Sequence, residues 1–185
     1  HLHGKTGILF VLNTCEEGLG NSNGCRYIVE QYKNRIKSFI SFDGYLNQCT
    51  NSAVGSKRYR LTVYCQGGHS YADFGKENAI ETLSKIMYEL SHQQIPTEAK
   101  TTYNFGKIEG GTTINAIAST ATLLYEYRSS MQNCLDIMEK QFQEIVSHYS
   151  NVEIEILGAQ PPVTSWQVYI HEPHKSERLQ ILRAV

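Results

Sequence analysis

The sequence lacks two features that would place it in common classes of protein. Its longest purely apolar run, residues 8–12, is far shorter than the ~20 residues that a membrane-spanning helix needs. Its charges are nearly balanced, since 17 Lys and Arg face 18 Asp and Glu. It therefore lacks the strongly cationic surface on which nucleic-acid binding depends. We expect a protein that neither spans a membrane nor binds nucleic acid.

The five cysteines form no pattern that predicts a disulfide framework or a zinc ribbon. They are Cys15, Cys25, Cys49, Cys65 and Cys134, an odd number without any Cys-x-x-Cys pair. We expect reduced thiols that serve as small apolar residues, as is typical of a cytoplasmic protein. The chain opens with His1 instead of Met and shows no signal peptide, so we interpret it as a fragment.

Residues 1–55 have the pattern of part of a doubly wound α/β domain. Residues 7–13 are a continuous apolar run, which is typical of a parallel strand covered on both faces. A helix should follow, with Asn21 or Ser22 as its N-cap, and residues 36–42 predict a second strand. The apolar face of the helix comprises Cys25, Ile28, Val29 and Tyr32. These elements make one βαβ unit, although a whole domain of this class needs several more strands.

Residues 56–161 predict a ferredoxin-like βαββαβ module. Four segments have strand patterns and two have the apolar stripe of a helix. The strands are expected at 58–65, 101–108, 120–128 and 152–157, and the helices at 78–92 and 131–149. Residues 162–185 are too few to form a domain, so we expect them to return into the first one. The fold class is thus α/β, a partial doubly wound domain with an inserted ferredoxin-like domain.

Alternation and helical spacing also predict which side chains of the module face inward. On each strand, the alternating residues that are expected to share one face are Tyr59, Leu61, Val63 and Cys65, then Ala121, Leu123, Tyr125 and Tyr127, and then Val152, Ile154 and Ile156. On the second helix, they are expected to be Cys134, Leu135, Met138, Phe142, Ile145, Val146 and Tyr149.

Three acidic residues follow the predicted strands of the first domain. Glu16 and Glu17 come directly after the first strand, and Asp43 follows the second. Carboxyl ends of parallel strands meet at one edge of a sheet, where such domains bind ligands. Because neighbouring carboxylates repel, a divalent cation would stabilise them there and leave one Glu as general base for a metal-bound water. The alternative is that Glu16 and Glu17 are solvated loop acids.

Five short motifs occur in the order in which they appear in the M20 metallopeptidases. They are residues 14–18 (TCEEG), 42–44 (FDG), 67–70 (GGHS), 78–80 (NAI) and 110–115 (GGTTIN). The chain resembles this family, which includes aminoacylases, carboxypeptidase G-type enzymes, peptidase T and acetylornithine deacetylases, over nearly its whole length. The resemblance implies a two-zinc hydrolase that cleaves an amide bond in a small peptide or an N-acyl amino acid, as an exopeptidase, dipeptidase or deacylase.

The resemblance also implies roles for the acidic residues and for the module. Glu16 would be the general base, Glu17 a ligand of one zinc ion and Asp43 a ligand of the other. The βαββαβ module would be a lid over the catalytic domain and, in many members, the dimerisation domain of a homodimer.

Three further residues would act from the lid. His69 would donate to the developing oxyanion, in dimeric members from the partner's lid. Asn115 and Arg128 would hold the polar end of the substrate, with Arg128 as a fork onto a carboxylate. Without the resemblance, His69 could be a surface residue, Asn115 a turn residue and Arg128 a solvated strand residue.

The chain also departs from the family pattern. Cys15 stands where Asp usually precedes the Glu pair, and Ala118 stands where Pro is common. The early His-x-Asp segment, the bridging Asp and the late His ligand are missing, and we do not expect these to be replaced by His1, His3, His171 or His174. With one ligand per zinc ion, we expect the chain by itself to bind zinc weakly and to be inactive.

Two other functions use the same fold. The module could serve only in dimerisation or binding, with acids that have no catalytic role. In that case no function would require His69, Asn115 and Arg128 to face one cleft. A hydrolase lid, in contrast, would keep them facing one cleft. An RNA-binding sheet would need aromatic pairs in a basic central strand, which Tyr125 and Tyr127 beside Glu126 do not provide.

Overall fold

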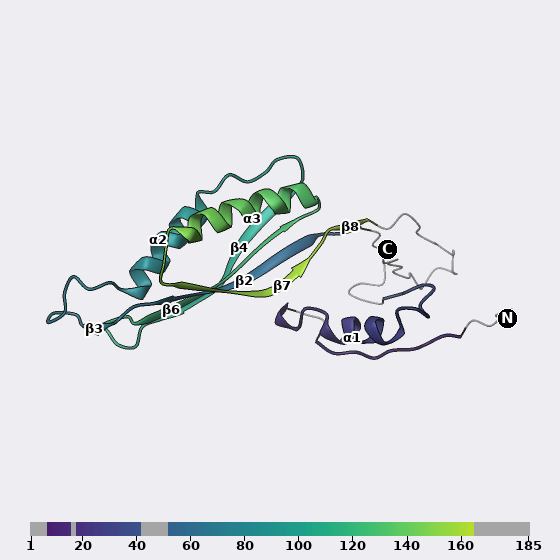
Figure 1. Ribbon diagram of the computed structural model, residues 1–185, viewed down its shortest axis with the longest axis horizontal. Helices are drawn as coiled ribbons and strands as arrows, with labels where there is room; N and C mark the ends of the chain where they lie inside the picture. Colours follow the sequence, from purple (N-terminus) through teal and green to yellow (C-terminus); the bar gives the residue numbers. More distant parts are fainter. Residues whose placement is uncertain (1–6, 16–17, 42–51, 165–185) are drawn as a thin grey trace, which may run out of the picture. The chain divides into compact units, whose positions relative to one another are not determined.

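The described part of the chain belongs to two units, each considered by itself. The computed structural model describes residues 7–15, 18–41 and 52–164 (Figure 1). The first unit is His1–Ser38 and the second is Phe39–Val185. Within those described ranges, no helix has both the length and the apolar character needed to cross a membrane.

The first unit contains a short 3-10 turn, η1 (Gly18–Gly20), and one α-helix, α1 (Asn23–Tyr32). The predicted helix is confirmed, and its residues Cys25, Ile28 and Tyr32 are half-buried. Its expected cap is not found, because Ser22 at the N-cap position makes no side-chain capping bond. The φ angle of Ser22 is 57°, whereas a capping side chain needs an extended backbone at this position.

The two strands predicted for this region are not formed in its described residues. Neither residues 7–13 nor residues 36–41 belong to a strand, and Phe10 and Leu12 are exposed. A parallel strand is stable only when hydrogen-bonded neighbours flank it in a sheet. The described residues of the first unit provide no such neighbours, so the apolar run does not form a strand there.

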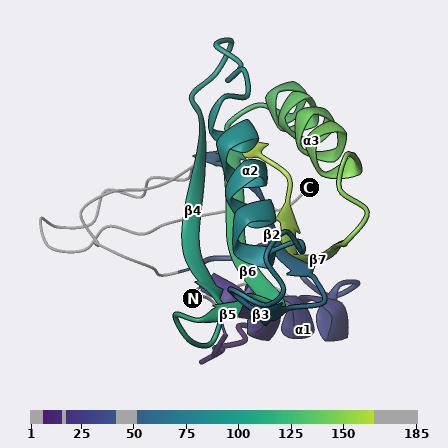
Figure 2. The same ribbon diagram turned by 90° about the vertical axis from the view of Figure 1, so that its left-hand side faces the viewer.

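The second unit holds a four-stranded antiparallel sheet with two helices on one face (Figures 1 and 2). Its strands are β2 (Gly55–Tyr64), β4 (Thr101–Gly110), β6 (Thr120–Ser129) and β7 (Val152–Gln160), in the spatial order β4-β6-β2-β7. The helices are α2 (Ala79–Ser91) and α3 (Gln132–Ser147). The chain order strand, helix, strand, strand, helix, strand confirms the ferredoxin-like module and the mixed α/β class.

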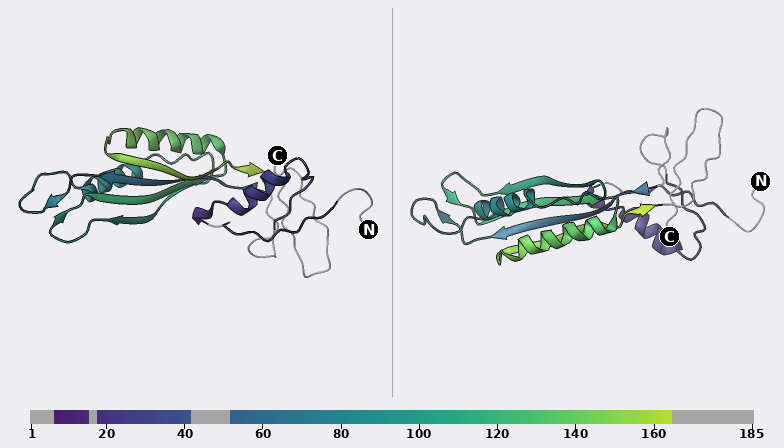
Figure 3. Two further views of the ribbon diagram at one scale, coloured as in Figure 1. Left: turned by 60° about the horizontal axis from the view of Figure 1, so that its bottom comes forward. Right: turned by 90° about the horizontal axis from the view of Figure 1, so that it is seen from above.

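Two small sheets lie at opposite ends of the four-stranded sheet (Figure 3). At one end β1 (Ser52–Ala53) pairs with β8 (Val163–Thr164), so the chain enters and leaves the module through adjacent strands. At the other end β3 (Gly68–His69) pairs with β5 (Ala116–Ile117). Both pairs are antiparallel.

The core lies between the two helices and the inner strands β2 and β6. Register places Tyr59, Leu61 and Val63 of β2 opposite Tyr125, Leu123 and Ala121 of β6, and all six are buried, as predicted. The helices bury Ala79, Leu83, Ile86 and Leu90 from α2, and Cys134, Leu135, Met138, Phe142 and Val146 from α3. Asn78 caps α2, because its Oδ1 accepts the backbone N–H of Ile80 at 3.0 Å.

Ile154 and Ile156 share one face of their strand but are not buried. Register places them opposite Leu61 and Tyr59, on the face that the helices cover, yet Ile154 is 37% and Ile156 is 66% exposed. Their strand, β7, is an edge strand, because no strand of the described residues pairs with its outer side. Alternation alone therefore predicts the face of an edge strand but not its burial.

A polar cluster beneath α3 ties this helix to the sheet. Lys57 Nζ donates to Glu139 Oε2 at 2.7 Å, and the hydroxyls of Tyr59 and Tyr127 donate to the same oxygen. Gln143 Nε2 donates to the other carboxylate oxygen at 2.8 Å. Burial by itself would raise the pKa of the Glu139 carboxyl, but these donors outweigh it and lower that pKa to about 2. Burial and the hydrogen bond to Glu139 raise the pKa of both tyrosines.

Candidate functional site

The predicted catalytic and metal-binding acids, Glu16, Glu17 and Asp43, lie outside the described residues. Their proposed convergence therefore stays a prediction. The same holds for the terminal histidines His1, His3, His171 and His174, which also lie outside. Within residues 7–15, 18–41 and 52–164, no three His, Cys, Asp or Glu side chains form a group that could hold a metal ion.

His69 and Asn115 are brought together at the end of the module formed by β3 and β5. His69 is opposite Ala116 in the β3–β5 register, and Ser70 N–H donates to the Asn115 carbonyl at 2.9 Å. The loops that carry them are far apart in sequence, and the two-residue strands hold them side by side. The structure thus places two of the three predicted lid residues at one tip.

The ring of His69 is oriented by its own loop. Its Nδ1 accepts the backbone N–H groups of Tyr71 and Ala72 at 3.2 and 3.3 Å. A ring nitrogen that accepts hydrogen bonds carries no proton, so this geometry assigns the ring proton to Nε2. His69 is exposed, which leaves Nε2 available as a hydrogen-bond donor to a ligand.

The side chain of Asn115 is held through its oxygen. Thr113 Oγ1 donates to Asn115 Oδ1 at 2.7 Å, and within the described residues the amide nitrogen has no hydrogen-bond partner. Asn115 is exposed. The tip of the module therefore offers two side-chain donors, the Nε2–H of His69 and the amide of Asn115. Two donors of this kind suit a carbonyl oxygen or an oxyanion.

Arg128 lies near the other end of the sheet, so it is far from His69 of the same chain. Arg128 is opposite Ser56 on β2 and Thr102 on β4. It lies eight residues along β6 from Thr120, the first residue of β6 after β5. At about 3.3 Å per residue, this separation is about 26 Å. The expectation that His69, Asn115 and Arg128 face one cleft is therefore wrong for a single chain.

The guanidinium of Arg128 is already engaged on the helix-free face of the sheet. Its Nε and Nη2 donate to the two carboxylate oxygens of Glu126 at 3.1 and 3.0 Å. Glu126 also lies 3.5 Å from Arg58 Nε. Farther along the same face, Arg60 pairs with Glu155. Glu126 was not predicted as a partner of Arg128, although its position two residues earlier on the same strand places both side chains on one face.

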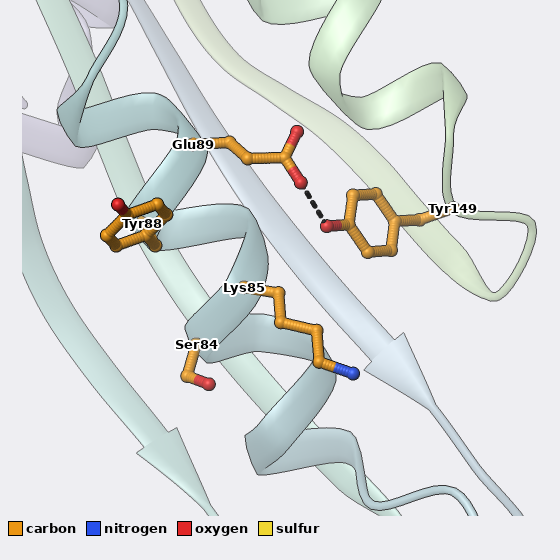
Figure 4. Close-up of a pocket in the computed structure, with 5 residues that line it drawn as sticks. All are labelled: Ser84, Lys85, Tyr88, Glu89 and Tyr149. Carbon is orange, nitrogen blue, oxygen red and sulfur yellow. Dashed lines mark hydrogen bonds between the residues drawn. The ribbon is translucent and has the colours of Figure 1, made fainter.

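An open hollow on the surface of α2 contains none of the predicted site residues (Figure 4). It is lined by Ser84, Lys85, Tyr88, Glu89 and Tyr149. The hydroxyl of Tyr149 donates to Glu89 in this hollow. Burial and this bond raise the pKa of Tyr149 to about 12. The carboxylate of Glu89 therefore links α2 with Tyr149, two residues after the end of α3.

The sequence of this chain matches the sequence model of a known protein family. The model is described as a peptidase dimerisation domain of the M20 class, and it matches residues 51–152, more than half of the chain. The chain belongs to the M20 peptidase dimerisation-domain family. The matched residues begin just before β1 and end at the start of β7.

Solved structures with the same fold include several amidohydrolases. An amidase of the hydantoinase/carbamoylase family from Burkholderia phymatum is 20% identical, with a TM-score of 0.55 over 68% of this chain and 35% of its own. The aminobenzoyl-glutamate utilization protein from Klebsiella pneumoniae is 16% identical, with a TM-score of 0.52 over 59% and 29%. A hydantoinase/carbamoylase-family amidase from Burkholderia vietnamiensis is 15% identical, with a TM-score of 0.51 over 62% and 30%.

These likenesses cover only part of the other proteins. The chain matches about a third of the length of each of the three structures. No curated protein matches it. At this level of identity the solved structures establish the fold of the M20 dimerisation domain in this chain.

Proposed function

We propose that this chain carries the lid and part of the catalytic domain of a zinc-dependent amide hydrolase. The observation that carries the proposal is the pairing of two free donors, His69 Nε2–H and the Asn115 amide, at the tip of an M20 dimerisation domain. In this proposal residues 1–55 belong to the catalytic domain, residues 56–161 form the lid and residues 162–185 return to the catalytic domain. The adjacent strands β1 and β8 are what an inserted domain needs at its two connections.

The proposed substrate is a small peptide or an N-acyl amino acid, cleaved by an exopeptidase, dipeptidase or deacylase reaction. The names of the similar structures, amidases and an aminobenzoyl-glutamate utilization protein, support a substrate with a C–N amide bond. His69 would stabilise the oxyanion, Asn115 would bind a substrate oxygen, and Arg128 would bind a substrate carboxylate as a fork.

Both ends of the lid contribute to this site only if two chains cooperate. The separation of about 26 Å along β6 keeps Arg128 of one chain away from a substrate held by its own His69 and Asn115. We assign His69 and Asn115 to the substrate site of the partner chain, and Arg128 to the site of its own chain. Glu126 would then have to release Arg128 when a substrate carboxylate arrives.

The proposed metal ligands have suitable donor chemistry but are too few. The carboxylates of Glu17 and Asp43 are oxygen donors that zinc accepts, with one on each ion, whereas catalytic zinc sites have three protein ligands. When bound, zinc would lower the pKa of a water molecule toward ~7 and polarise the amide carbonyl. Glu16 would take the proton from that water and pass it to the leaving amine.

Calorimetric titration of the 185-residue chain with zinc, together with the full reading frame of its gene, tests this proposal. We expect no saturable binding of two ions at micromolar zinc, because single carboxylates bind weakly. We also expect a His-x-Asp segment before residue 1 and a His ligand after residue 185. Tight binding of two ions by this chain would contradict the ligand assignment, and a reading frame without those ligands would contradict the hydrolase.

Dimerisation through a sheet edge is the second testable part. β4 and β7 are the outer strands, and pairing across a two-fold axis would cover one of these edges. We expect light scattering after gel filtration to give a homodimer. Ile108→Lys on β4 and Ile156→Lys on β7 are matched changes at 55% and 66% exposed positions, so neither should unfold the module. One of them should give a monomer. A monomeric wild type, or a dimer that survives both changes, would contradict the edge interface.

A non-catalytic dimerisation module is the second candidate function. It is favoured by one observation, the hydrogen-bonded fork between Arg128 and Glu126, which engages Nε and Nη2 of the guanidinium within the chain itself. A complete ligand set in the reading frame, with amide hydrolysis by the encoded protein, would exclude it.

A further inference from the structure

The loop that follows β3 holds an acidic residue at its centre. Asp73 Oδ2 accepts the backbone N–H of His69 at 2.8 Å, and the backbone N–H of Asp73 donates back to the His69 carbonyl at 2.9 Å. Lys76 Nζ lies 2.7 Å from the other carboxylate oxygen. Asp73 is therefore joined to the backbone of His69 by two hydrogen bonds and to Lys76 by an ion pair.

The glycine before His69 makes room for this carboxylate. A Cβ atom on Gly68 would lie 2.7 Å from Asp73 Oδ2 and 2.8 Å from Asp73 Cβ, closer than real contacts allow. The φ angle of Gly68 is also positive, at 154°. Any larger residue at position 68 would push Asp73 away from the His69 amide.

The closed loop fixes the histidine ring as well as its backbone. The turn that Asp73 stabilises brings the N–H groups of Tyr71 and Ala72 to Nδ1 of His69. Both groups belong to residues between His69 and Asp73. If the Asp73 carboxylate were removed, the turn would lose its anchor and these two donors would no longer be held at Nδ1.

We propose that Asp73 is a positioning residue that fixes His69 with its proton on Nε2, facing the substrate site beside Asn115. This inference rests on the proposed function for the use of the donor, but the positioning itself is a property of the loop. The ion pair with Lys76 and the hydrogen bond from the His69 amide lower the pKa of Asp73, so the carboxylate stays charged at neutral pH.

Nitrogen-15 NMR of the histidine rings in the 185-residue chain tests the proposal without a substrate. A His69→Gln variant assigns the signals of the ring. In the wild type, Nδ1 should resonate in the range of unprotonated ring nitrogen and Nε2 in the range of N–H. In Asp73→Ala the two signals should move toward each other as the tautomers mix, and hydrogen exchange of the His69 amide should accelerate about tenfold or more.

Three further variants make the result specific. Asp73→Asn keeps an acceptor oxygen and should restore the wild-type signals. Gly68→Ala should reproduce the effect of Asp73→Ala from the other side of the contact. Asp136→Ala, at an exposed position on α3, should change nothing at His69.

Unchanged ring signals in Asp73→Ala would overturn the proposal, even if the amide exchanged faster. Failure of Asp73→Asn to restore them would overturn the role of the acceptor oxygen. Because the measurement involves no hydrolysis, its outcome is separate from the test of the proposed function. A fixed ring in a protein without amide hydrolase activity would leave the positioning role standing and remove only its catalytic use.

Discussion

Replacing Phe142 with alanine should lower the unfolding free energy of the module by about 3–5 kcal/mol, the usual cost of removing a buried aromatic ring. Phe142 on α3 is 0% exposed. Its ring stacks on Tyr59 with centroids 4.3 Å apart and on Tyr125 with centroids 5.7 Å apart. The substitution would leave a cavity between α3 and the two central strands. Urea denaturation followed by circular dichroism measures the loss.

The matched control is Phe74→Ala, the same change at a position that is 91% exposed. We expect it to alter the unfolding free energy by less than about 0.5 kcal/mol. A loss below about 1 kcal/mol for Phe142→Ala would contradict the stacked core, because it would mean that the ring is not enclosed between α3 and the sheet.

The second large effect concerns Glu139, whose substitution by glutamine should cost about 2–3 kcal/mol. Glutamine has nearly the same shape but no charge, so it cannot accept equally from Lys57, Tyr59 and Tyr127. The side chain of Glu139 is 23% exposed, so water replaces these partners only in part. Glu144→Gln, an exposed change on the same helix, serves as the control and should have little effect.

The contribution of Glu139 should also depend on pH, with a definite sign. Its pKa is lowered in the folded chain from 4.5 to about 2. The stabilisation is therefore complete above about pH 5 and is lost as the pH falls from about 4.5 through about 2. The difference in unfolding free energy between the wild type and Glu139→Gln should shrink over this range. A difference that stays constant from pH 6 to pH 2.5 would show that the charge of Glu139 contributes nothing.

The sequence predicted the second unit well because its strands and helices have clear periods. The alternation around Leu61 and Leu123 and the helical stripe that contains Leu83 each correspond to one buried face. The pattern of residues 7–13 is equally apolar, but an apolar run becomes a strand only when other strands pair with it. The local pattern predicts which residues are apolar enough to be buried, but it does not predict whether neighbouring strands are present to pair with them.

The candidate site was predictable in part for a similar reason. The Gly-rich turn at His69 and the turn at Asn115 are short-range signals, and the structure joins them through β3 and β5. The distance from Asn115 to Arg128 depends on the length and direction of β6, which motif spacing does not express. Asp73 was not singled out, although an Asp four residues after His69 in a turn is a recognisable signal for a side-chain bond to the backbone.

The pairing of β1 with β8 has a practical consequence for engineering. Because Ser52 is opposite Thr164, the two severed ends of a segment cut at these residues would lie next to each other. Such a segment can be grafted into a surface loop of an unrelated host, or permuted so that a short linker joins its former termini. The transferred segment would keep the tip that carries His69 at the end of the module opposite the new junctions.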